Sequence, residues 1–206
     1  MAKGMLYVIS AASGAGKTSL VSALLKQLPD VEVSVSHTTR MMRDGERDCV
    51  NYHFVDRGTF DEMVTAGDFF EYANVFGNMY GTSRQHIQDQ LLKGKDVILE
   101  IDWQGTRQIR QLVANCKTIH VLPPSMKALR DRLESRGQDA DDIIEQRMRE
   151  AVNEMSHYAE YDYIVINDDF DTAVGNLAAI IVSNRLLLEP QQQNHAALLS
   201  ELLTLE

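Results

Sequence analysis

The hydrophobic positions of the chain fall into short runs that alternate with amphipathic stretches. Runs of strand length lie at 6–10, 97–102, 118–122 and 163–167, and helical spacing of apolar residues lies at 17–28, 105–112 and 172–188. Continuously apolar runs are typical of parallel strands buried on both faces, and their alternation with helices predicts an α/β fold: a parallel β-sheet core flanked by helices. Residues 31–36 alternate instead between apolar and polar, which predicts an edge or half-buried strand.

Two stretches interrupt this alternation. The first mixes short β-like pieces at 52–55 and 69–76 with a brief helix near 60–66. A turn at 77–81 then leads to Thr82, which we expect to start a helix through a capping box with Gln85. The second stretch is helical and charged, with a break at 137–139.

We therefore expect a single unit of three parts. The two insertions would act as flaps that exclude water from one site. The expected boundaries are a core of residues 1–36, 89–124 and 159–206, a small mixed α/β insertion at 37–88 and a helical lid at 125–158.

Directly after the first apolar run, the chain breaks into a loop of small residues that ends in Gly-Lys-Thr. The backbone N–H groups of such a loop, with the positive N-terminus of the next helix, can surround a nucleotide β-phosphate. Lys17 would reach the β and γ oxygens, and the Thr18 hydroxyl would ligate Mg²⁺. The strict pattern has Gly where Ala11 stands, and the alternative is an ordinary strand-to-helix turn. The loop reads Ser10-Ala11-Ala12-Ser13-Gly14-Ala15-Gly16-Lys17-Thr18.

The overall charge narrows the range of partners. The 206 residues carry a formal net charge of −10, which argues against a general nucleic-acid or anionic-membrane binder. Cys49 and Cys116 are isolated and show no metal-ligand spacing. Residues 1–4 run straight into the first strand, and no apolar run approaches a membrane span, so we expect a cytoplasmic protein.

Positive charge is concentrated locally in the first insertion. Arg40 and Arg43 stand three residues apart on a loop, and Tyr52 and Tyr80 follow. Two guanidinium groups and two phenols could bind a phosphate monoester dianion. The alternative is a solvated basic turn.

Glu71 is a carboxylate within the aromatic stretch Phe69-Phe70-Glu71-Tyr72. Such a residue commonly lies on the solvent face of a strand. Its functional interpretation is that it accepts hydrogen bonds from a base edge with two adjacent donors. Guanine has that edge, whereas adenine would leave the polar groups unpaired.

Further charged residues fall where a phosphoryl-transfer site would need them. Asp102 ends an apolar strand, as does the acid that helps to position Mg²⁺ in phosphate-loop enzymes. Arg132, Arg136 and Arg147 lie in the helical lid, either over the site or paired with acids such as Asp131 or Glu134.

Several motifs in order resemble those of the guanylate kinase family, from about Leu6 to Leu188. They are Ser13-Gly14-Ala15-Gly16-Lys17-Thr18, Ser36-His37-Thr38-Thr39-Arg40-x-x-Arg43-x-Gly45-Glu46, Gly77-Asn78-Met79-Tyr80-Gly81-Thr82, Ile101-Asp102-Trp103-Gln104-Gly105, Leu133-x-x-Arg136-Gly137 and Asn167-Asp168-Asp169. The resemblance implies a kinase of purine nucleotide metabolism that transfers the γ-phosphate of ATP to GMP with Mg²⁺. The alternatives are a guanylate-kinase-like protein-binding module with weak catalysis, or a kinase for another acceptor.

The resemblance also implies a role for each matching residue. Catalysis would fall to Lys17, Asp102, Arg136 and Arg147, and Asp102 would lie near the acceptor or the water shell of the metal. ATP would be bound by Ala11, Ala12, Ser13, Gly14, Ala15, Gly16, Lys17, Thr18 and Asn167. Guanine would contact Ser36, Glu71 and Thr82, and the GMP phosphate would contact Arg40, Arg43, Tyr52 and Tyr80.

The chain departs from the family pattern at three loop positions. Ala12 and Met42 stand where Pro is usual, and Cys49 replaces a frequent Gly. These changes alter loop geometry without removing a reactive group. After Pro190 the tail carries apolar residues around a predicted helix, which either packs back onto the core or forms a homo-oligomer contact. They are Ala196, Ala197, Leu198, Leu199, Leu202, Leu203 and Leu205.

Overall fold

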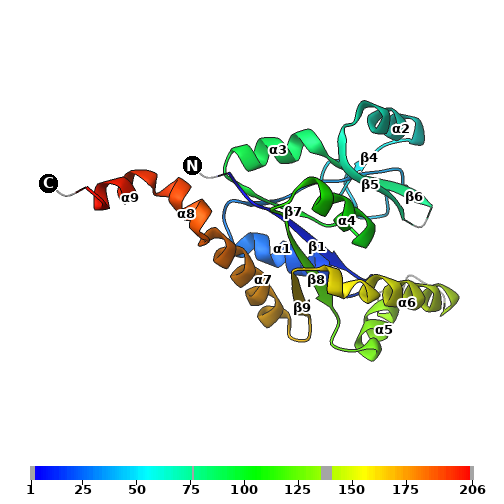
Figure 1. Ribbon diagram of the computed structural model, residues 1–206. Helices are drawn as coiled ribbons and strands as arrows, with labels where there is room; N and C mark the ends of the chain where they lie inside the picture. The colour runs from blue at the N-terminus through cyan, green and yellow to red at the C-terminus, as the bar shows by residue number, and fades with distance from the viewer. Residues whose placement is uncertain (1–2, 76, 136–140, 205–206) are drawn as a thin grey trace.

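The computed structural model describes residues 3–75, 77–135 and 141–204 and contains a parallel five-stranded sheet (Figure 1). Every strand pair in this sheet is parallel, which confirms the predicted α/β core. The edge strand predicted at 31–36 is present, although its ladder covers three residues only. In spatial order the strands are β2 (Val31–Val33), β7 (Asp96–Leu99), β1 (Leu6–Ala11), β8 (Lys117–Leu122) and β9 (Tyr163–Ile166).

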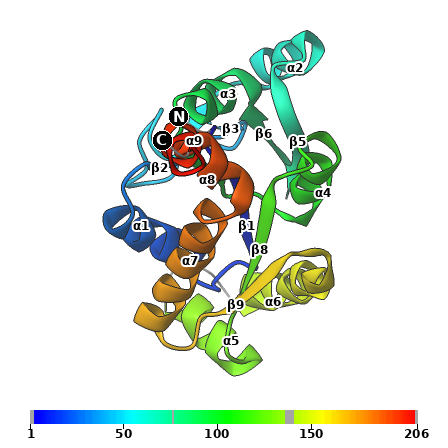
Figure 2. The ribbon, with the colours of Figure 1, turned by 60° about the vertical axis from the view of Figure 1, so that its left-hand side comes forward.

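Helices cover both faces of this sheet because successive side chains of each strand point to opposite faces. Helices α1 (Lys17–Gln27) and α7 (Phe170–Arg185) lie side by side on one face, where their apolar residues join Tyr7 and Ile9 (Figures 1 and 2). Helices α3 (Arg84–Leu92) and α4 (Trp103–Leu112) pack against the opposite face, on Val8 and its neighbours. Both layers of the predicted core are thus present.

A second, smaller sheet carries the first insertion. Its strands run β4 (His53–Phe54), β3 (His37–Thr38), β6 (Asn78–Ser83) and β5 (Phe69–Val75), with both parallel and antiparallel pairs. Helix α2 (Arg57–Ala66) covers it through Phe60, which stacks on Phe69.

Two local expectations in this insertion are wrong. The turn predicted at 77–81 is confined to its first residue, because 78–83 form strand β6 along β5. Thr82 therefore lies in a strand, and helix α3 begins after Ser83 without a side-chain cap. Helix α3 spans residue 88, the expected end of the insertion, and its Ile87 and Leu91 belong to the core of the large sheet.

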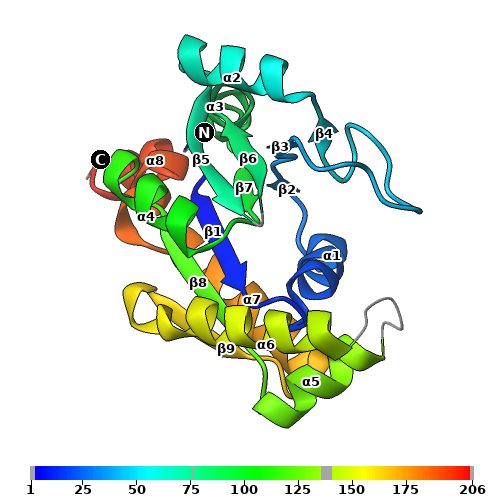
Figure 3. The same ribbon diagram turned by 90° about the vertical axis from the view of Figure 1, so that its right-hand side faces the viewer.

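The second insertion forms two helices over the end of β1. Helices α5 (Met126–Glu134) and α6 (Asp141–Ser156) share an apolar cluster that includes Ala12 of the loop after β1. A short helix, η1 (Tyr158–Glu160), leads back to β9. Figure 3 shows α5 and α6 on one side of the C-terminal end of β1 and the small sheet with α2 on the other. The predicted break at 137–139 lies outside the described residues.

The C-terminal tail forms helices α8 (Leu188–Asn194) and α9 (Ala196–Leu202), which extend away from the sheet (Figure 1). The side chains of Leu198, Leu199, Leu202 and Leu203 are all exposed. The alternative in which the tail packs back onto the core is therefore wrong for the residues described; Leu205 lies outside them. In the described part of the chain, no helix is both long and apolar enough to cross a bilayer.

Candidate nucleotide site

The loop after β1 has the backbone geometry of a phosphate cradle. Gly14 and Gly16 have φ of 90° and 98°, a left-handed conformation that a side chain would strain. A Cβ at Gly16 would also lie 2.4 Å from Nδ2 of Asn167. Helix α1 starts at Lys17, and neither a side-chain cap nor an acidic residue occupies its first turn. Its N-terminal N–H groups and dipole are therefore available to an anion.

The remaining predicted loop residues lie along this cradle. Ala11 is the last residue of β1, Ala12 and Ala15 are buried, and Ser13 and Thr18 are exposed. Asn167 follows β9 and donates from Nδ2 to the Ala15 carbonyl at 2.7 Å. The residue that follows β9 thus holds the loop in place through this hydrogen bond.

A hollow of about 210 Å³ lies beside the cradle, lined by Gly16, Ser19, Arg132, Asn167, Asp168 and Phe170. The Arg132 guanidinium donates to the Asn167 carbonyl at 2.9 Å and weakly to the Ala15 carbonyl at 3.4 Å. Its described hydrogen bonds therefore go to the carbonyls of Asn167 and Ala15 and not to Asp131 or Glu134. Sequence reasoning weighed Arg132 but assigned it no role, because helical spacing did not show that it faces Asn167.

Glu71, Thr82 and Ser36 form a buried acceptor cluster in the small sheet. The Glu71 side chain is almost wholly buried, and its Oε1 accepts a short hydrogen bond from the Thr82 hydroxyl. The Ser36 hydroxyl lies 3.4 Å from that of Thr82. The solvent-facing alternative for Glu71 is therefore wrong. A β-bulge between Phe69 and Glu71 breaks the strand alternation, and three successive residues are buried.

Burial governs the ionisation of this cluster. Loss of hydration raises the pKa of Glu71 to about 7; the Thr82 hydrogen bond opposes the shift and the nearby Asp102 charge adds to it. Helix α4 packs directly against the cluster, because a Cβ at Gly105 would lie 2.6 Å from Glu71 Oε2. Only glycine permits this approach.

A second cluster gathers the predicted phosphate-binding side chains. One nitrogen of Arg40 lies 2.7 and 3.0 Å from the two carboxylate oxygens of Glu46. The guanidinium lies 5.4 Å from the Tyr52 ring centroid, and the Tyr52 and Tyr80 ring centroids are 5.8 Å apart. Arg43 is exposed, and its backbone N–H donates to Glu46 at 2.8 Å. Three of the four predicted residues are thus together, with Arg43 on the adjoining loop.

Carboxylates line the end of β7 between the two clusters. Asp102 caps helix α4 by accepting from the Gly105 N–H at 3.0 Å, and it is near enough to Glu71 to affect its pKa. Glu100 lies near Tyr52, and its Oε1 is buried without a hydrogen-bond partner among the described residues. The sequence did not single out Glu100. Its place two residues before Asp102, on the same side of an extended chain, was a usable signal.

Two predicted lid arginines remain, Arg147 and Arg136. Arg147 lies on α6 and is partly exposed. Arg136 lies outside the described residues, so its predicted position stays a prediction.

The departures from the family pattern have local consequences. Cys49 has φ of 60°, a left-handed conformation in which glycine would be unstrained. Ala12 is buried against Leu129 and Leu133 of the lid. Met42 is more than half exposed and touches neither cluster in any described hydrogen bond or ring contact.

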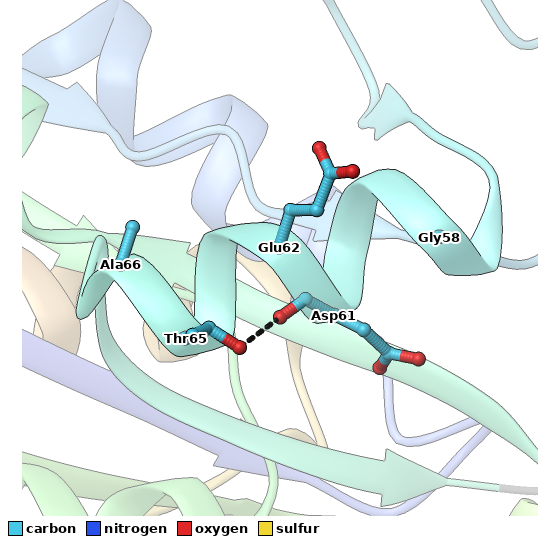
Figure 4. A pocket seen from close by; sticks show the side chains of 5 residues that line it. All are labelled: Gly58, Asp61, Glu62, Thr65 and Ala66. Carbon is cyan, nitrogen blue, oxygen red and sulfur yellow. Dashed lines mark hydrogen bonds between the residues drawn. The ribbon is translucent and has the colours of Figure 1, made fainter.

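A larger hollow, of about 460 Å³, lies on the outer surface of α2 (Figure 4). Its lining comes from that helix alone, and Figure 4 shows the Asp61 and Glu62 carboxylates pointing away from each other. None of the predicted site residues lines it, so the candidate site is the cradle with the two clusters.

Comparisons with known proteins show the family to which this chain belongs. Residues 3–184 match the family model described as guanylate kinase. The chain is 59% identical over 200 residues to the guanylate kinase of Pseudomonas fluorescens, with 97% of each chain covered. It is 58% identical to that of Alkalilimnicola ehrlichii, with 97% of this chain and 98% of the relative covered. The crystal structure of guanylate kinase from Anaplasma phagocytophilum superposes with a TM-score of 0.77 at 32% identity, over 91% of this chain and 89% of that one.

Proposed function

This chain belongs to the guanylate kinase family and catalyses ATP + GMP ⇌ ADP + GDP in purine nucleotide metabolism, and we propose how its residues divide that reaction. The core, residues 1–36, 89–124 and 159–206, would bind ATP. The insertion at 37–88, in which the last strand of the small sheet ends at Ser83, would bind GMP. The lid at 125–158 would close over both. The two hydrophobic clusters of the large sheet and the separate clusters of the lid and small sheet support this division.

The buried acceptor cluster is the observation that carries the assignment of GMP as acceptor. Ionised Glu71 would accept from guanine N1–H and the 2-amino group, while the Ser36 and Thr82 hydroxyls would contact the remaining base edge. A buried carboxylate that lacks such donors costs free energy, so the site disfavours binding of adenine. The protein-binding alternative gains no support, because the phosphate cradle keeps its lysine, Lys17.

Arg40, Arg43, Tyr52 and Tyr80 would hold the GMP phosphate. The hydrogen bonds from Arg40 to Glu46 support a preformed site, since they hold the guanidinium beside the two phenols. Glu100 lies near Tyr52, and its Oε1 has no hydrogen-bond partner among the described residues. This oxygen would accept a hydrogen bond from the same nucleotide.

ATP would bind with its phosphates on residues 11–18 and its base in the hollow beside Gly16. Asn167 and Arg132 line that hollow, and the planar guanidinium of Arg132 suits stacking on a base. Lys17 would contact the β and γ oxygens.

The residues present fit Mg²⁺ held mainly by nucleotide phosphates. The Thr18 hydroxyl is exposed at the first turn of α1, and no group of three or more acidic or histidine side chains in the described part of the chain could cage a metal. Mg²⁺ commonly keeps several waters and one or two protein ligands beside substrate phosphates. When bound, the ion would neutralise charge on the β and γ phosphates.

Transfer needs no covalent intermediate. The GMP phosphate attacks in line, and catalysis rests on positioning and charge neutralisation. Lys17, Arg147 and Arg136 would neutralise the transferring group, and Asp102 would orient the acceptor side or metal-bound water. Ala12 of the cradle and Ala151 of the lid belong to the same apolar cluster. This shared packing supports coupling of lid closure to ATP binding.

The reaction is tested by measuring ADP release from MgATP with GMP, dGMP, AMP, UMP and CMP as acceptors. We expect GMP to be the preferred acceptor by at least about a hundredfold over AMP, because of the unpaired polar groups that adenine leaves. Equal rates with every acceptor, or release independent of acceptor, would contradict the assignment.

Replacing Gly105 by Ala is expected to raise the KM for GMP by roughly tenfold or more, equivalent to about 1.4 kcal/mol. The added Cβ would lie 2.6 Å from Glu71 Oε2 and displace the carboxylate that binds guanine. The matched control is Gly175→Ala in α7, where a Cβ meets no atom within 4 Å. Steady-state kinetics check this: equal KM values for both variants would mean that Glu71 does not bind the base.

We propose that the tail forms a contact with a second copy of this chain. The exposed leucines on α8 and α9 support it, since an extended apolar surface of this kind is usually covered by a partner. Ending the chain at Pro190 is expected to lower the mass measured by light scattering while kcat is kept. A monomer before truncation, or an unchanged mass after it, would rule out the contact.

We also propose that the protein works in the cytoplasm, where ATP and GMP are available. Two cysteines without a disulfide between them, Cys49 exposed and Cys116 buried, support a reducing compartment.

A further inference from the structure

Glu154 of the lid helix α6 is turned toward the nucleotide site. The apolar face of α6 consists of Ile144, Met148, Ala151 and Met155, which pack with Ala12 of the phosphate cradle. Glu154 lies three residues after Ala151 and therefore on an adjacent stripe of the helix. It also lies seven residues after Arg147, which places both charged groups on nearly the same side.

The Glu154 carboxylate lies near the start of helix α4. The backbone N–H of Trp103, the first residue of α4, acts to lower the pKa of Glu154, but burial outweighs it. Its Oε1 is buried and has no hydrogen-bond partner among the described residues. A buried carboxylate oxygen without a partner is unfavourable, so this oxygen calls for a hydrogen-bond donor that reaches it during function.

The charges around Glu154 indicate which group that is. Asp102, the residue just before α4, repels the Glu154 carboxylate, and the Lys17 ammonium attracts it. Burial, followed by Asp102, raises the pKa of Glu154 to about 7. Lys17 has three N–H donors, so it can contact a carboxylate and nucleotide phosphates together.

We infer that Glu154 is a positioning residue for phosphoryl transfer, whose free oxygen accepts a hydrogen bond from Lys17 and aims the ammonium at the transferring phosphate. The inference rests on the proposed function of this site. Because Glu154 belongs to the lid, Lys17 would be oriented only when the lid is seated on the cradle. The arrangement would link lid closure to catalysis through one side chain.

The test compares Glu154→Gln with Glu150→Gln in the full chain. Glu150 lies one turn earlier on α6, and its described hydrogen bond is with Gln146 on the same helix. We expect Glu154→Gln to lower kcat roughly ten- to a hundredfold per mole of folded protein, with KM values changed less than about threefold. The amide keeps the shape of the carboxylate but cannot attract the ammonium by charge. Glu150→Gln is expected to match the wild type.

Thermal unfolding separates positioning from a structural role. The raised pKa of Glu154 means that its stabilising contribution is present below about pH 4.5 and is lost as the pH rises through about 7. At pH 8 the amide variant should therefore be at least as stable as the wild type. A lower Tm with unchanged kcat would assign Glu154 a structural role and overturn the inference.

A double variant identifies the partner. If Glu154 acts through Lys17, Glu154→Gln should change kcat less than about twofold in a Lys17→Met background. Fully additive losses would overturn the inference. Activity of the wild type and Glu150→Gln establishes the kinase reaction independently, and its absence in both would refute the proposed function instead.

Discussion

Lys17→Met is expected to leave the protein folded and to lower kcat with MgATP and GMP by roughly two to three orders of magnitude. The substitution removes a positive charge from the first residue of α1, where negative charge builds on the β and γ oxygens during transfer. Methionine keeps a long, flexible, apolar side chain, so the helix should be preserved. Steady-state release of ADP at saturating MgATP and GMP measures the loss.

The matched control is Lys26→Met, at the exposed last turn of the same helix. It removes an identical charge from α1 and should keep kcat within about twofold, as expected for surface substitutions. Circular dichroism verifies that both variants fold. A folded Lys17→Met protein with near-normal kcat would show that the cradle does not act on the transferring phosphate.

Glu71→Gln is expected to abolish most of the preference for GMP over AMP. Guanine presents two donors at this edge, and the glutamine amide opposes one of them with a donor of its own. Loss of a charge-assisted bond and an unpaired buried group should cost about 2–4 kcal/mol. The ratio of kcat/KM for GMP and AMP should therefore fall by roughly 30- to 1000-fold. Activity with AMP should change little or rise.

Stability distinguishes lost recognition from damage to the fold. Burial raises the pKa of Glu71 to about 7, so its stabilising contribution is lost as the pH rises from about 4.5 through 7. At pH 8 the Gln variant should unfold at the same or a higher temperature than the wild type. The exposed Glu62→Gln variant on α2 serves as control. A GMP/AMP ratio that stays within a few-fold of the wild type would move guanine recognition to another residue.

Much of the core was predictable because its signals are local. The apolar runs are continuous where strands are buried on both faces, and the run before Ala11 breaks at the residues that form the cradle. Gly14 and Gly16 are needed there for left-handed backbone conformations, which their residue type indicates without any tertiary contact. The failures were local as well: Gly77 and Asn78 are typical turn residues, yet pairing with β5 makes 78–83 a strand.

The site depends more on long-range contacts. Its residue types and their order along the chain predicted a cradle, a cluster of arginine and tyrosine and a candidate base acceptor. The burial of Glu71 required a β-bulge and the close approach of Gly105 from a helix 34 positions later, which no periodicity indicates. Arg132 meets Asn167 only because the lid returns to the cradle.

The sequence by itself therefore determined the chemistry available to this protein: a phosphate loop, its lysine, and the acceptors and donors of a nucleotide kinase. These follow from residue type and short spacing, which act within one turn or strand. Only the tertiary structure decided which side chains face one another. It left the tail exposed and buried a Glu154 oxygen that has no hydrogen-bond partner in the described part of the chain. Those outcomes depend on packing between elements distant in the chain, where burial sets both the pKa of a carboxylate and the partner that it needs.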